Sequence, residues 1–343
     1  MNLKHIVRTM ILGFTSAAVA CCGIATFAQS DGSFDQRIEK IMNRSEFAHS
    51  RFGIKFILAD MGDVVYELNS PQLFVPGSTT KLLSTGTALE LLGGDYRFRT
   101  KIYRTGPVQK DGTLDGDLVL VASGDMDLSN RIQPDGSLAF EDEDHSYGGP
   151  DSKGLPGDPL QVINEFAKQV AGKGIKRIKG RVLVDATLFP EGERELGTGV
   201  VISPIVVNDN VVDVVVSPGT TEGSPVQLKI APQTAYVTII NQATTQKAGT
   251  KTSLSYENEK LNPDGTRSVT LTGALALGAK PAMVSYAVPE PTRYAATLLV
   301  EALKKEGMVA VLAAPSDQVD FKALAAKYTA DNVLAEHVSP PFK

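Results

Sequence analysis

Tryptophan is absent from this chain of 343 residues, and cysteine and histidine are scarce. The two cysteines, Cys21 and Cys22, are adjacent and lie near the amino terminus, so residues 23–343 contain no thiol. That part of the chain therefore cannot form a disulfide framework, a thiolate metal site or a cysteine nucleophile. A chain without thiols is compatible with an oxidising compartment but does not require one.

An excess of basic charge is also missing. The formal net charge is −5, which gives no electrostatic basis for binding nucleic acid, and we expect no nucleic-acid partner. With 42% hydrophobic and 21% charged residues, the composition is that of a globular protein. The chain has 31 glycines and 19 prolines but only 6% aromatic residues, which favours many short elements over a long helical bundle.

The first 28 residues have the pattern of a secretion signal. A short basic start precedes the uncharged residues 9–28, and Thr26-Phe27-Ala28 offers small residues for cleavage before Gln29. We therefore expect an exported, periplasmic protein that has lost residues 1–28. Two alternatives stay open. The uncharged run is nearly long enough to span a membrane as an uncleaved anchor, and Cys21 is a candidate for lipid attachment.

Helices and strands are mixed at both ends of the chain, around a middle that is rich in strands. Apolar spacing predicts helices over residues 33–50, 78–92, 160–170 and 291–306. Runs of β-type residues between turns predict strands over residues 54–59, 64–68, 97–104, 118–122, 175–185, 211–216, 226–230, 236–240, 252–256 and 268–271. We expect an α/β (α+β) main domain that is interrupted by inserted domains, mostly β.

Ser78-Thr79-Thr80-Lys81 is the one Ser-x-x-Lys in the chain. On a helix, residues three apart face the same way, so the lysine amine can reach the serine hydroxyl. A serine hydroxyl becomes a good nucleophile when a neighbouring base takes its proton, and a neutral lysine can be that base. The tetrad alone is weak evidence, because a chain with 22 serines is expected to contain one by chance and because Pro-Gly-Ser is an ordinary helix cap.

Further segments in order strengthen the interpretation. A predicted hairpin and a proline-containing link precede the Ser78 helix, which is the arrangement that penicillin-recognising enzymes use. The chain resembles the class C low-molecular-mass penicillin-binding proteins, which are periplasmic D-alanyl-D-alanine carboxypeptidases and endopeptidases. The resemblance extends from about residue 53 to the end. It rests on five segments: Phe74-Val75-Pro76-Gly77-Ser78-Thr79-Thr80-Lys81, Leu118-Val119-Leu120-Val121-Ala122-Ser123-Gly124-Asp125, Asp185-Ala186-Thr187-Leu188-Phe189-Pro190, Val206-Val207-Asn208-Asp209-Asn210 and Glu336-His337-Val338-Ser339-Pro340-Pro341-Phe342.

The resemblance implies a penicillin-binding, serine β-lactamase-like transpeptidase domain. Its first part would be residues 29–100, the inserted domains residues 101–285, and the return segment residues 286–343. It also implies Ser78 as the nucleophile and Lys81 as its base, in acyl transfer from peptidoglycan peptides. β-Lactams would be acylating inhibitors. The protein would also associate peripherally with the membrane. No cofactor or metal is implied.

One departure from the family pattern concerns the rest of the site. The family's Ser-x-Asn and Lys-Thr-Gly motifs would follow the segment at residues 336–342, and this sequence contains neither. We therefore expect a C-terminally truncated, inactive or impaired enzyme, or a non-catalytic exported protein that binds peptidoglycan. Tyr256-Glu257-Asn258 and Lys251-Thr252-Ser253 come close to family motifs, but their order is wrong and we interpret both as structural.

Two other kinds of site receive less support. A Ser-His-Asp hydrolase would need a recognisable serine motif, and no Gly-x-Ser-x-Gly is present. Asp142-Glu143-Asp144-His145 has residue types that bind metal ions, but an acidic run in a loop is most often simply solvated. We expect this loop to be exposed and to hold no metal.

Overall fold

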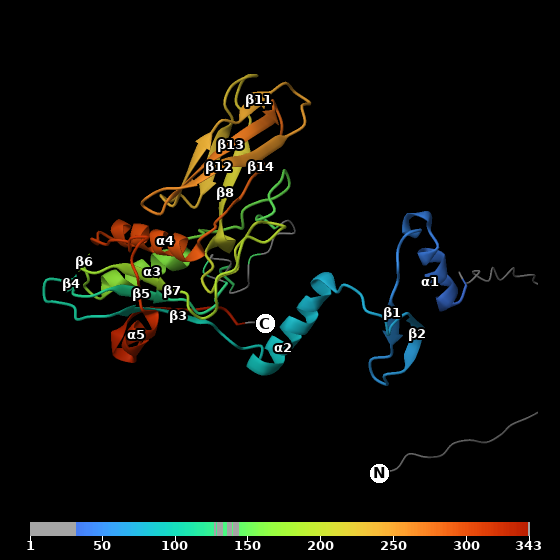
Figure 1. Cartoon of the computed structure of the whole chain (residues 1–343), viewed down its shortest axis with the longest axis horizontal. Helices are drawn as coiled ribbons and strands as arrows, with labels where there is room; N and C mark the ends of the chain where they lie inside the picture. The colour runs from blue at the N-terminus through green and yellow to red at the C-terminus, as the bar shows by residue number, and fades with distance from the viewer. Residues whose placement is uncertain (1–31, 127, 129–132, 136–138, 140–143, 342–343) are drawn as a thin grey trace, which may run out of the picture. The chain divides into compact units, whose positions relative to one another are not determined.

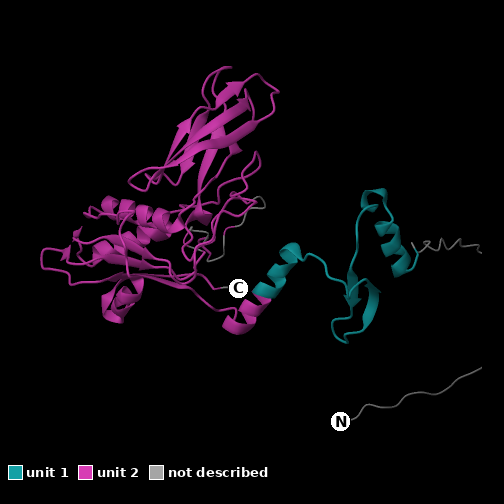
Figure 2. Cartoon of the chain, viewed as in Figure 1, with its two compact units in different colours: residues 1–84 teal, residues 85–343 magenta. Residues whose placement is uncertain are grey.

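The computed structural model describes residues 32–126, 128, 133–135, 139 and 144–341 (Figure 1). The predicted signal segment, including Cys21, lies outside the described residues. The chain divides into two compact units, residues 1–84 and 85–343 (Figure 2), and each is described by itself.

The first unit consists of a helix, a hairpin and the start of a second helix. Helix α1 is Phe34–Met42, and the antiparallel hairpin is formed by β1 (Ile54–Ile57) and β2 (Val64–Leu68). The phenyl ring of Phe34 meets those of Phe56 and Tyr66 edge-on, with centroids 5.4 and 6.2 Å apart. Helix α1 therefore packs on the hairpin through aromatic contacts, which are favourable in this edge-to-face geometry.

The predicted helix over residues 33–50 is too long. Ser33 and Gln36 form a capping box that starts α1, and the helix ends at Met42. The Asn43 N–H bonds back to the Glu39 carbonyl, and a separate 3-10 turn follows at Ser45–Phe47. After the hairpin, a 3-10 turn at Gly77–Thr79 leads into α2 (Thr80–Leu92), as the predicted helix over residues 78–92 required.

The second unit is built around a four-stranded sheet in the order β16-β3-β5-β7. The strand β16 pairs antiparallel with β3, β3 pairs antiparallel with β5, and β5 pairs parallel with β7. Helices α3 and α4 pack together on this sheet, and α5 lies on its other side in Figure 1. The bounds are β3 Arg99–Arg104, β5 Leu118–Val121, β7 Val182–Asp185, β16 Val333–Val338, α3 Gln161–Gly172, α4 Pro291–Lys305 and α5 Phe321–Leu324.

Two smaller sheets account for the predicted β-rich middle. In one, β8 pairs with β9 on one edge and with β14 and then β15 on the other, all antiparallel. In the other, β13 pairs antiparallel with β12 and parallel with β10 and β11 in succession. Their bounds are β8 Val211–Ser217, β9 Gln227–Ala231, β10 Val237–Asn241, β11 Thr244–Gln246, β12 Ser253–Leu261, β13 Arg267–Ala276, β14 Ala282–Met283 and β15 Tyr286–Ala287.

The predicted strand over residues 175–185 is interrupted. It is divided into β6 (Arg177–Ile178), which pairs with β4 (Thr113–Leu114), and β7. Gly180 separates the two pieces. A β-carbon there would lie 2.5 Å from the Gly116 carbonyl oxygen, so the close approach of the two chains requires glycine.

The main hydrophobic core lies between the four-stranded sheet and helices α3 and α4. Leu118, Leu120, Phe166 and Leu298 are among its fully buried members. Residues 286–343 contribute α4 and β16 to this same core, and the predicted domain limits stay a prediction. A second, smaller cluster joins the two smaller sheets. No helix in the described part of the chain is both long enough and apolar enough to cross a membrane.

Candidate active site

Ser78 and Lys81 lie where the 3-10 turn at Gly77–Thr79 runs into α2. The Lys81 Nζ atom donates a hydrogen bond of 2.8 Å to the Ser78 Oγ atom. Gly77 has a φ of +52°, a left-handed conformation that glycine adopts without strain, and it makes the turn possible. The spacing of the tetrad thus brings an amine and a hydroxyl together, while their catalytic roles stay a prediction.

The start of α2 also favours negative charge near Ser78. The Thr79 and Thr80 hydroxyls donate backwards to the carbonyls of Pro76 and Gly77, the second at 3.0 Å. The backbone N–H groups of Thr79 and Thr80 also donate to carbonyls of the turn, those of Pro76 and Gly77. The helix dipole is positive at this end, so it would stabilise an oxyanion that forms on a substrate beside Ser78.

Helix α2 has no buried residue, although it is rich in leucine. Leu82 and Leu83, beside the lysine, are 75% and 73% exposed. Ser78 and Lys81 are exposed as well. The pair is therefore a hydroxyl and an amine at the start of α2.

The two near-matches to family motifs lie in β12 and at its entry. Tyr256 lies in β12, and its hydroxyl donates to the Val284 carbonyl at 2.8 Å. Burial raises the pKa of Tyr256 above its ordinary value, which suits a hydrogen-bonded core tyrosine. Lys251 and Thr252 form the exposed entry to the same strand.

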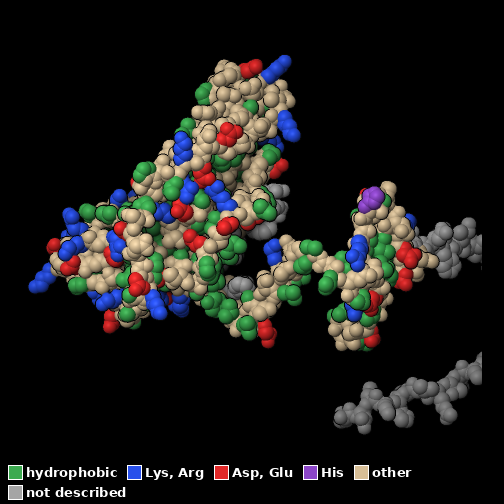
Figure 3. All heavy atoms as spheres, viewed as in Figure 1, with side chains coloured by type: hydrophobic (Ala, Val, Ile, Leu, Met, Phe, Trp, Pro, Cys, Tyr) green, Lys and Arg blue, Asp and Glu red, His purple; other side chains and the backbone are tan. Residues whose placement is uncertain are grey.

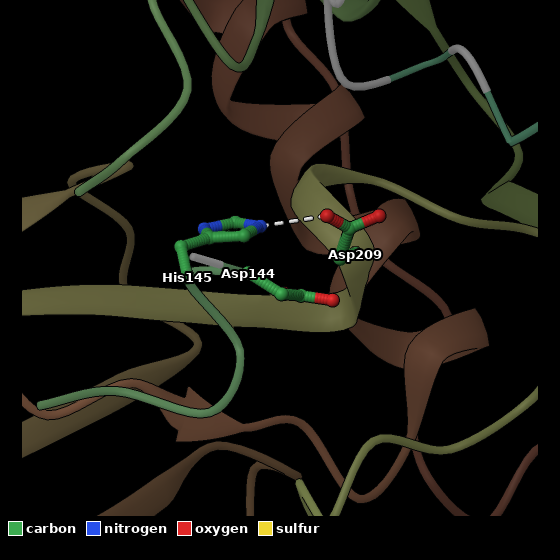
Figure 4. Close-up of side chains that lie close together, drawn as sticks. All are labelled: Asp144, His145 and Asp209. Carbon is green, nitrogen blue, oxygen red and sulfur yellow. Dashed lines mark hydrogen bonds and ion pairs between the residues drawn. The ribbon is translucent and has the colours of Figure 1, made fainter. Parts of the chain in front are cut away.

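The acidic loop at residues 142–145 was expected to be exposed, and the structure differs from this at one residue. Asp142 and Glu143 lie outside the described residues, and Asp144 is exposed as expected. His145, however, is only 2% exposed, so the prediction of a solvated loop is wrong for this residue. Its Nδ1 atom lies 2.8 Å from Asp213 Oδ1, and its Nε2 atom lies 2.6 Å from Asp209 Oδ2 (Figure 4).

The two carboxylates around His145 come from sequence positions 64 and 68 residues away. Asp213, at the start of β8, also accepts from the Asn208 amide at 3.2 Å and from the Ser285 hydroxyl at 3.1 Å. Asp209 has a φ of +51°, in a turn that holds its carboxylate against the ring. Carboxylates only accept hydrogen bonds, so the arrangement suits a ring that donates from both nitrogens. No pattern in the sequence predicted this cluster.

Ligand atoms of Asp144, His145 and Asp209 all lie within 4.8 Å of one another, which is close enough to hold a metal ion. The ring nitrogens are already occupied by direct hydrogen bonds to Asp213 and Asp209. These bonds account for the arrangement without an ion. The cluster is therefore best described as a buried polar bridge between the loop and β8.

A second buried histidine lies on β16. His337 is 9% exposed, and its Nε2 atom has no hydrogen-bond partner among the described residues. Asp125 Oδ2 lies 3.9 Å from Nε2, and Glu165 Oε2 lies 4.0 Å from Nδ1, both too far for a hydrogen bond. Burial lowers the pKa of His337, and the charge of Glu165 partly opposes this. The structure thus brings together two of the segments that carry the family resemblance.

Comparison with known proteins assigns the family. Residues 34–343 match the family model described as the D-Ala-D-Ala carboxypeptidase 3 (S13) family. The chain belongs to this S13 family. It is 27% identical over 303 residues to a D-alanyl-D-alanine carboxypeptidase of Actinomadura sp. (strain R39), a match that covers 84% of this chain and 48% of that protein.

Two Haemophilus influenzae comparisons agree with the S13 assignment. The carboxypeptidase DacB is 24% identical over 138 residues, which is 40% of this chain and 22% of DacB. The crystal structure of penicillin binding protein 4 (dacB) superposes with a TM-score of 0.60 at 20% identity, covering 84% of this chain and 56% of that one. A second crystal structure of that protein, complexed with a β-lactam, gives a TM-score of 0.52 at 19% identity, covering 84% and 55%.

These comparisons confirm the predicted family and the mixed α/β fold of a penicillin-binding protein. This S13 chain spans about half the length of the Actinomadura protein and of the solved Haemophilus chain.

Proposed function

We propose that this chain is a serine-type D-Ala-D-Ala carboxypeptidase or endopeptidase that acts on peptidoglycan peptides through an acyl-enzyme at Ser78. The observation that carries the proposal is the 2.8 Å hydrogen bond between Lys81 Nζ and Ser78 Oγ in a member of the S13 family. The names of the curated relatives, which are D-alanyl-D-alanine carboxypeptidases, support the substrate class.

The chemistry follows from the two side chains. Lys81, in its neutral form, takes the hydroxyl proton as Ser78 Oγ attacks the carbonyl carbon of the bond between two D-alanines. The tetrahedral oxyanion collapses, the new Oγ–carbon ester remains, and the D-alanine amine leaves with the proton that Lys81 returns. Water then attacks the ester, and Lys81 accepts a proton from this water and passes it back to Ser78. No cofactor is needed for either half of the reaction.

We also propose that β-lactams acylate Ser78. A β-lactam presents a strained amide to the same nucleophile, so its ring opening leaves an ester on Oγ. The Haemophilus penicillin-binding protein 4, which shares this fold, has been solved with a β-lactam, and this supports the choice of probe.

Activity of the 343-residue sequence alone is proposed to be impaired. The sequence carries no Ser-x-Asn and no Lys-Thr-Gly. Loss of one oxyanion donor alone costs about a hundredfold or more in turnover.

Covalent labelling by a fluorescent penicillin tests these proposals. We expect Ser78 to be acylated much more slowly than the nucleophile of the Actinomadura relative, with the adduct located by peptide mass spectrometry. Ser78→Ala should abolish labelling. The matched control is Ser84→Ala, because Ser84 lies on the same helix and its hydroxyl bonds only to the Thr80 carbonyl, at 3.3 Å.

Each contrary result has a definite meaning. Labelling that persists in Ser78→Ala would contradict the assignment of the nucleophile. Labelling at the rate of the relative would contradict impairment. A complete absence of adduct, with intact binding to peptidoglycan, would favour the non-catalytic binding protein.

We further propose that the protein is exported to the periplasm after loss of residues 1–28. The support is the basic start, the uncharged run and the small residues before Gln29.

A further inference from the structure

A pocket lies along the outer edge of β7 in the second unit. It has a volume of about 300 Å³ and is lined chiefly by β7, the start of α4 and the segment 312–321. Most of the lining side chains are apolar, and Leu312, Val319 and Phe321 are three of them. We call it the β7-edge pocket. Its volume is at the lower end of the range of about 300–1,000 Å³ for ligand pockets, so only a small ligand or the end of a longer one fits.

Backbone pairing along this outer edge stops before β7 ends. The inner edge of β7 pairs with β5, where the Ala122 N–H donates to the Asp185 carbonyl at 2.9 Å. Backbone groups alternate between the two edges of a strand, so those of Val182 and Val184 point to the outer edge. The Val182 N–H accordingly donates to the Val311 carbonyl at 2.9 Å. Val184 is 3% exposed and lines the pocket, and its N–H and C=O groups meet no partner among the described residues.

The chain segment beside β7 cannot complete the pairing. Its next acceptor, the Ala313 carbonyl, accepts from the Arg293 guanidinium. The Ala314 N–H donates to the Asp317 carboxylate at 3.0 Å. Pro315 has no N–H to donate. The segment is therefore held by other partners, and the end of β7 stays open beside it.

A ligand with a peptide backbone would complete this edge. Buried backbone N–H and C=O groups are almost always paired in native proteins, with protein groups or with water. Water can occupy the place when no ligand is bound. A peptide offers the acceptor that the Val184 N–H needs and the donor that the Val184 C=O needs. Addition of an extended peptide to an open sheet edge is a recurring form of recognition, in which neighbouring pockets take alternate side chains.

Arg293 supplies a positive charge at one end of the open edge. Its guanidinium donates to the backbone carbonyls of Ala313 and Asp264, and the ion pairs of the described residues do not include it. The Asp264 carboxylate accepts from Thr266 instead, at 2.7 Å from the hydroxyl and 2.9 Å from the N–H. Ala313 follows the last residue that pairs with β7, so the charge lies where the open edge begins. A terminal carboxylate there would form a charge-assisted hydrogen bond.

Both acids that line the pocket are engaged by other groups. Glu290 pairs with Arg267 at 2.7 Å, and Glu191 accepts from the Thr292 N–H at 3.0 Å. Over the face that Figure 3 shows, basic and acidic side chains are interspersed on the second unit. Attraction of an anion to the pocket therefore rests on Arg293 and not on a broad field of one sign.

We propose that the β7-edge pocket binds the apolar C-terminal residues of another polypeptide. These residues add to the end of β7 as an antiparallel strand, with small side chains among Leu312, Val319 and Phe321. An antiparallel strand ends where the open edge of β7 begins, so its terminal carboxylate meets Arg293. This binding goes beyond the proposed catalysis and does not depend on Ser78.

Fluorescence anisotropy with a synthetic peptide tests the proposal. The probe carries fluorescein at its N-terminus, then valine and alanine in alternation, and ends in alanine with a free carboxylate. Valine favours the extended form. We expect the chain from Gln29 onward to bind the probe with a Kd below about 1 mM, and to bind its C-terminal amide about tenfold more weakly. Methylation of the backbone nitrogens of the probe should abolish binding, because it removes the donor for the Val184 C=O.

Variants separate the charge of Arg293 from the apolar lining. Arg293→Gln should weaken binding of the free acid about tenfold and leave binding of the amide unchanged. Ala314→Glu places a negative charge at an exposed position of the lining and should weaken binding of the free acid about threefold. The matched control is Ser316→Glu, which adds the same charge at an exposed position of the same segment that does not line the pocket. Ser78→Ala should bind the probe like the wild type.

Four results would overturn the proposal. They are equal binding of the acid and the amide, equal binding of the methylated probe, no saturable binding up to about 1 mM, and loss of binding in Ser78→Ala, which would place the peptide at the proposed active site. Thermal unfolding shows whether Arg293→Gln is folded. If it is not, the comparison of Ala314→Glu with Ser316→Glu decides, and equal losses in these two variants would contradict the assigned pocket.

Discussion

At the scale of single residues, His145 is notable for two short hydrogen-bond contacts with carboxylates. Its ring lies between the Asp209 and Asp213 carboxylates and is 2% exposed. Removing one partner from a buried, charged hydrogen-bond network leaves the other partners desolvated and unsatisfied, which costs about 3–5 kcal/mol. The His145 ring is therefore expected to be worth much more to stability than its small size suggests.

The variant His145→Ala is expected to lower the free energy of unfolding of the second unit by about 3 kcal/mol or more. Urea unfolding followed by circular dichroism measures this, since the chain has no tryptophan to report by fluorescence. Tyr147→Ala is the matched control, because Tyr147 lies in the same loop and is 71% exposed. Similar, small losses in both variants would show that the bridge through His145 contributes little.

The sequence did not predict the His145 bridge, for a physical reason. A local run such as Asp142-Glu143-Asp144-His145 predicts solvation, because charged side chains in loops usually face water. Burial of His145 depends on Asp209 and Asp213, which approach through the fold of β8 and not through local spacing. In contrast, Ser78 and Lys81 are three residues apart on one helix, so their contact was predictable from the sequence.

At the scale of elements, strand β16 joins several parts of the second unit. It pairs with β3, where His337 lies opposite Thr100, and it packs on α3, where the Phe166 ring meets the His337 ring edge-on with centroids 6.3 Å apart. At its end, the Ser339 hydroxyl accepts from the Phe98 N–H at 2.9 Å. The titratable groups that face His337 are Asp125 and Glu165.

The packing of β16 against β3 and α3 is expected to become less stable as the pH is lowered. Burial lowers the pKa of His337 in the folded protein below 6.5, the value that it has when unfolded. Between these two values the unfolded chain binds more protons, so stability is complete above pH 6.5 and decreases as the pH falls through the folded pKa. The variant His337→Gln removes this titration.

Thermal unfolding between about pH 7 and about pH 5 measures the effect. The wild-type midpoint should fall more steeply with acidification than that of His337→Gln. His49→Gln, at an exposed position, should follow the wild type. If the thermal midpoints of all three proteins fall equally, the protonation of His337 does not control the packing of β16 against β3 and α3.

Element positions were predictable where local rules decide them. The apolar face of α4 and Pro291 at its first turn predicted residues 291–306, and the helix is Pro291–Lys305. The helix predicted from residue 33 also starts there, at the Ser33 capping box, but it ends at Met42, where the Asn43 N–H bonds back to the Glu39 carbonyl and a separate 3-10 turn follows. The short strands β4, β14 and β15, which have two residues each, carry no periodicity and exist through pairing with distant strands.

At the scale of the whole molecule, the location of the chain determines which surfaces can act. Peptidoglycan peptides are accessible to an exported protein, and the proposed role of Ser78 requires that location. Export also removes Cys21 and Cys22 if cleavage occurs before Gln29.

The mass of the exported protein tests this location. Expression of the full sequence in a bacterium with a periplasm should yield a soluble product that begins at Gln29 and contains no thiol, as intact mass and a thiol assay would show. Ala28→Trp places a large residue where signal peptidase needs a small one, and it should leave the full-length chain in the membrane fraction. The conservative Ala28→Ser should be processed like the wild type. Recovery of the wild type as an uncleaved membrane protein, or with lipid on Cys21, would contradict the proposed cleavage.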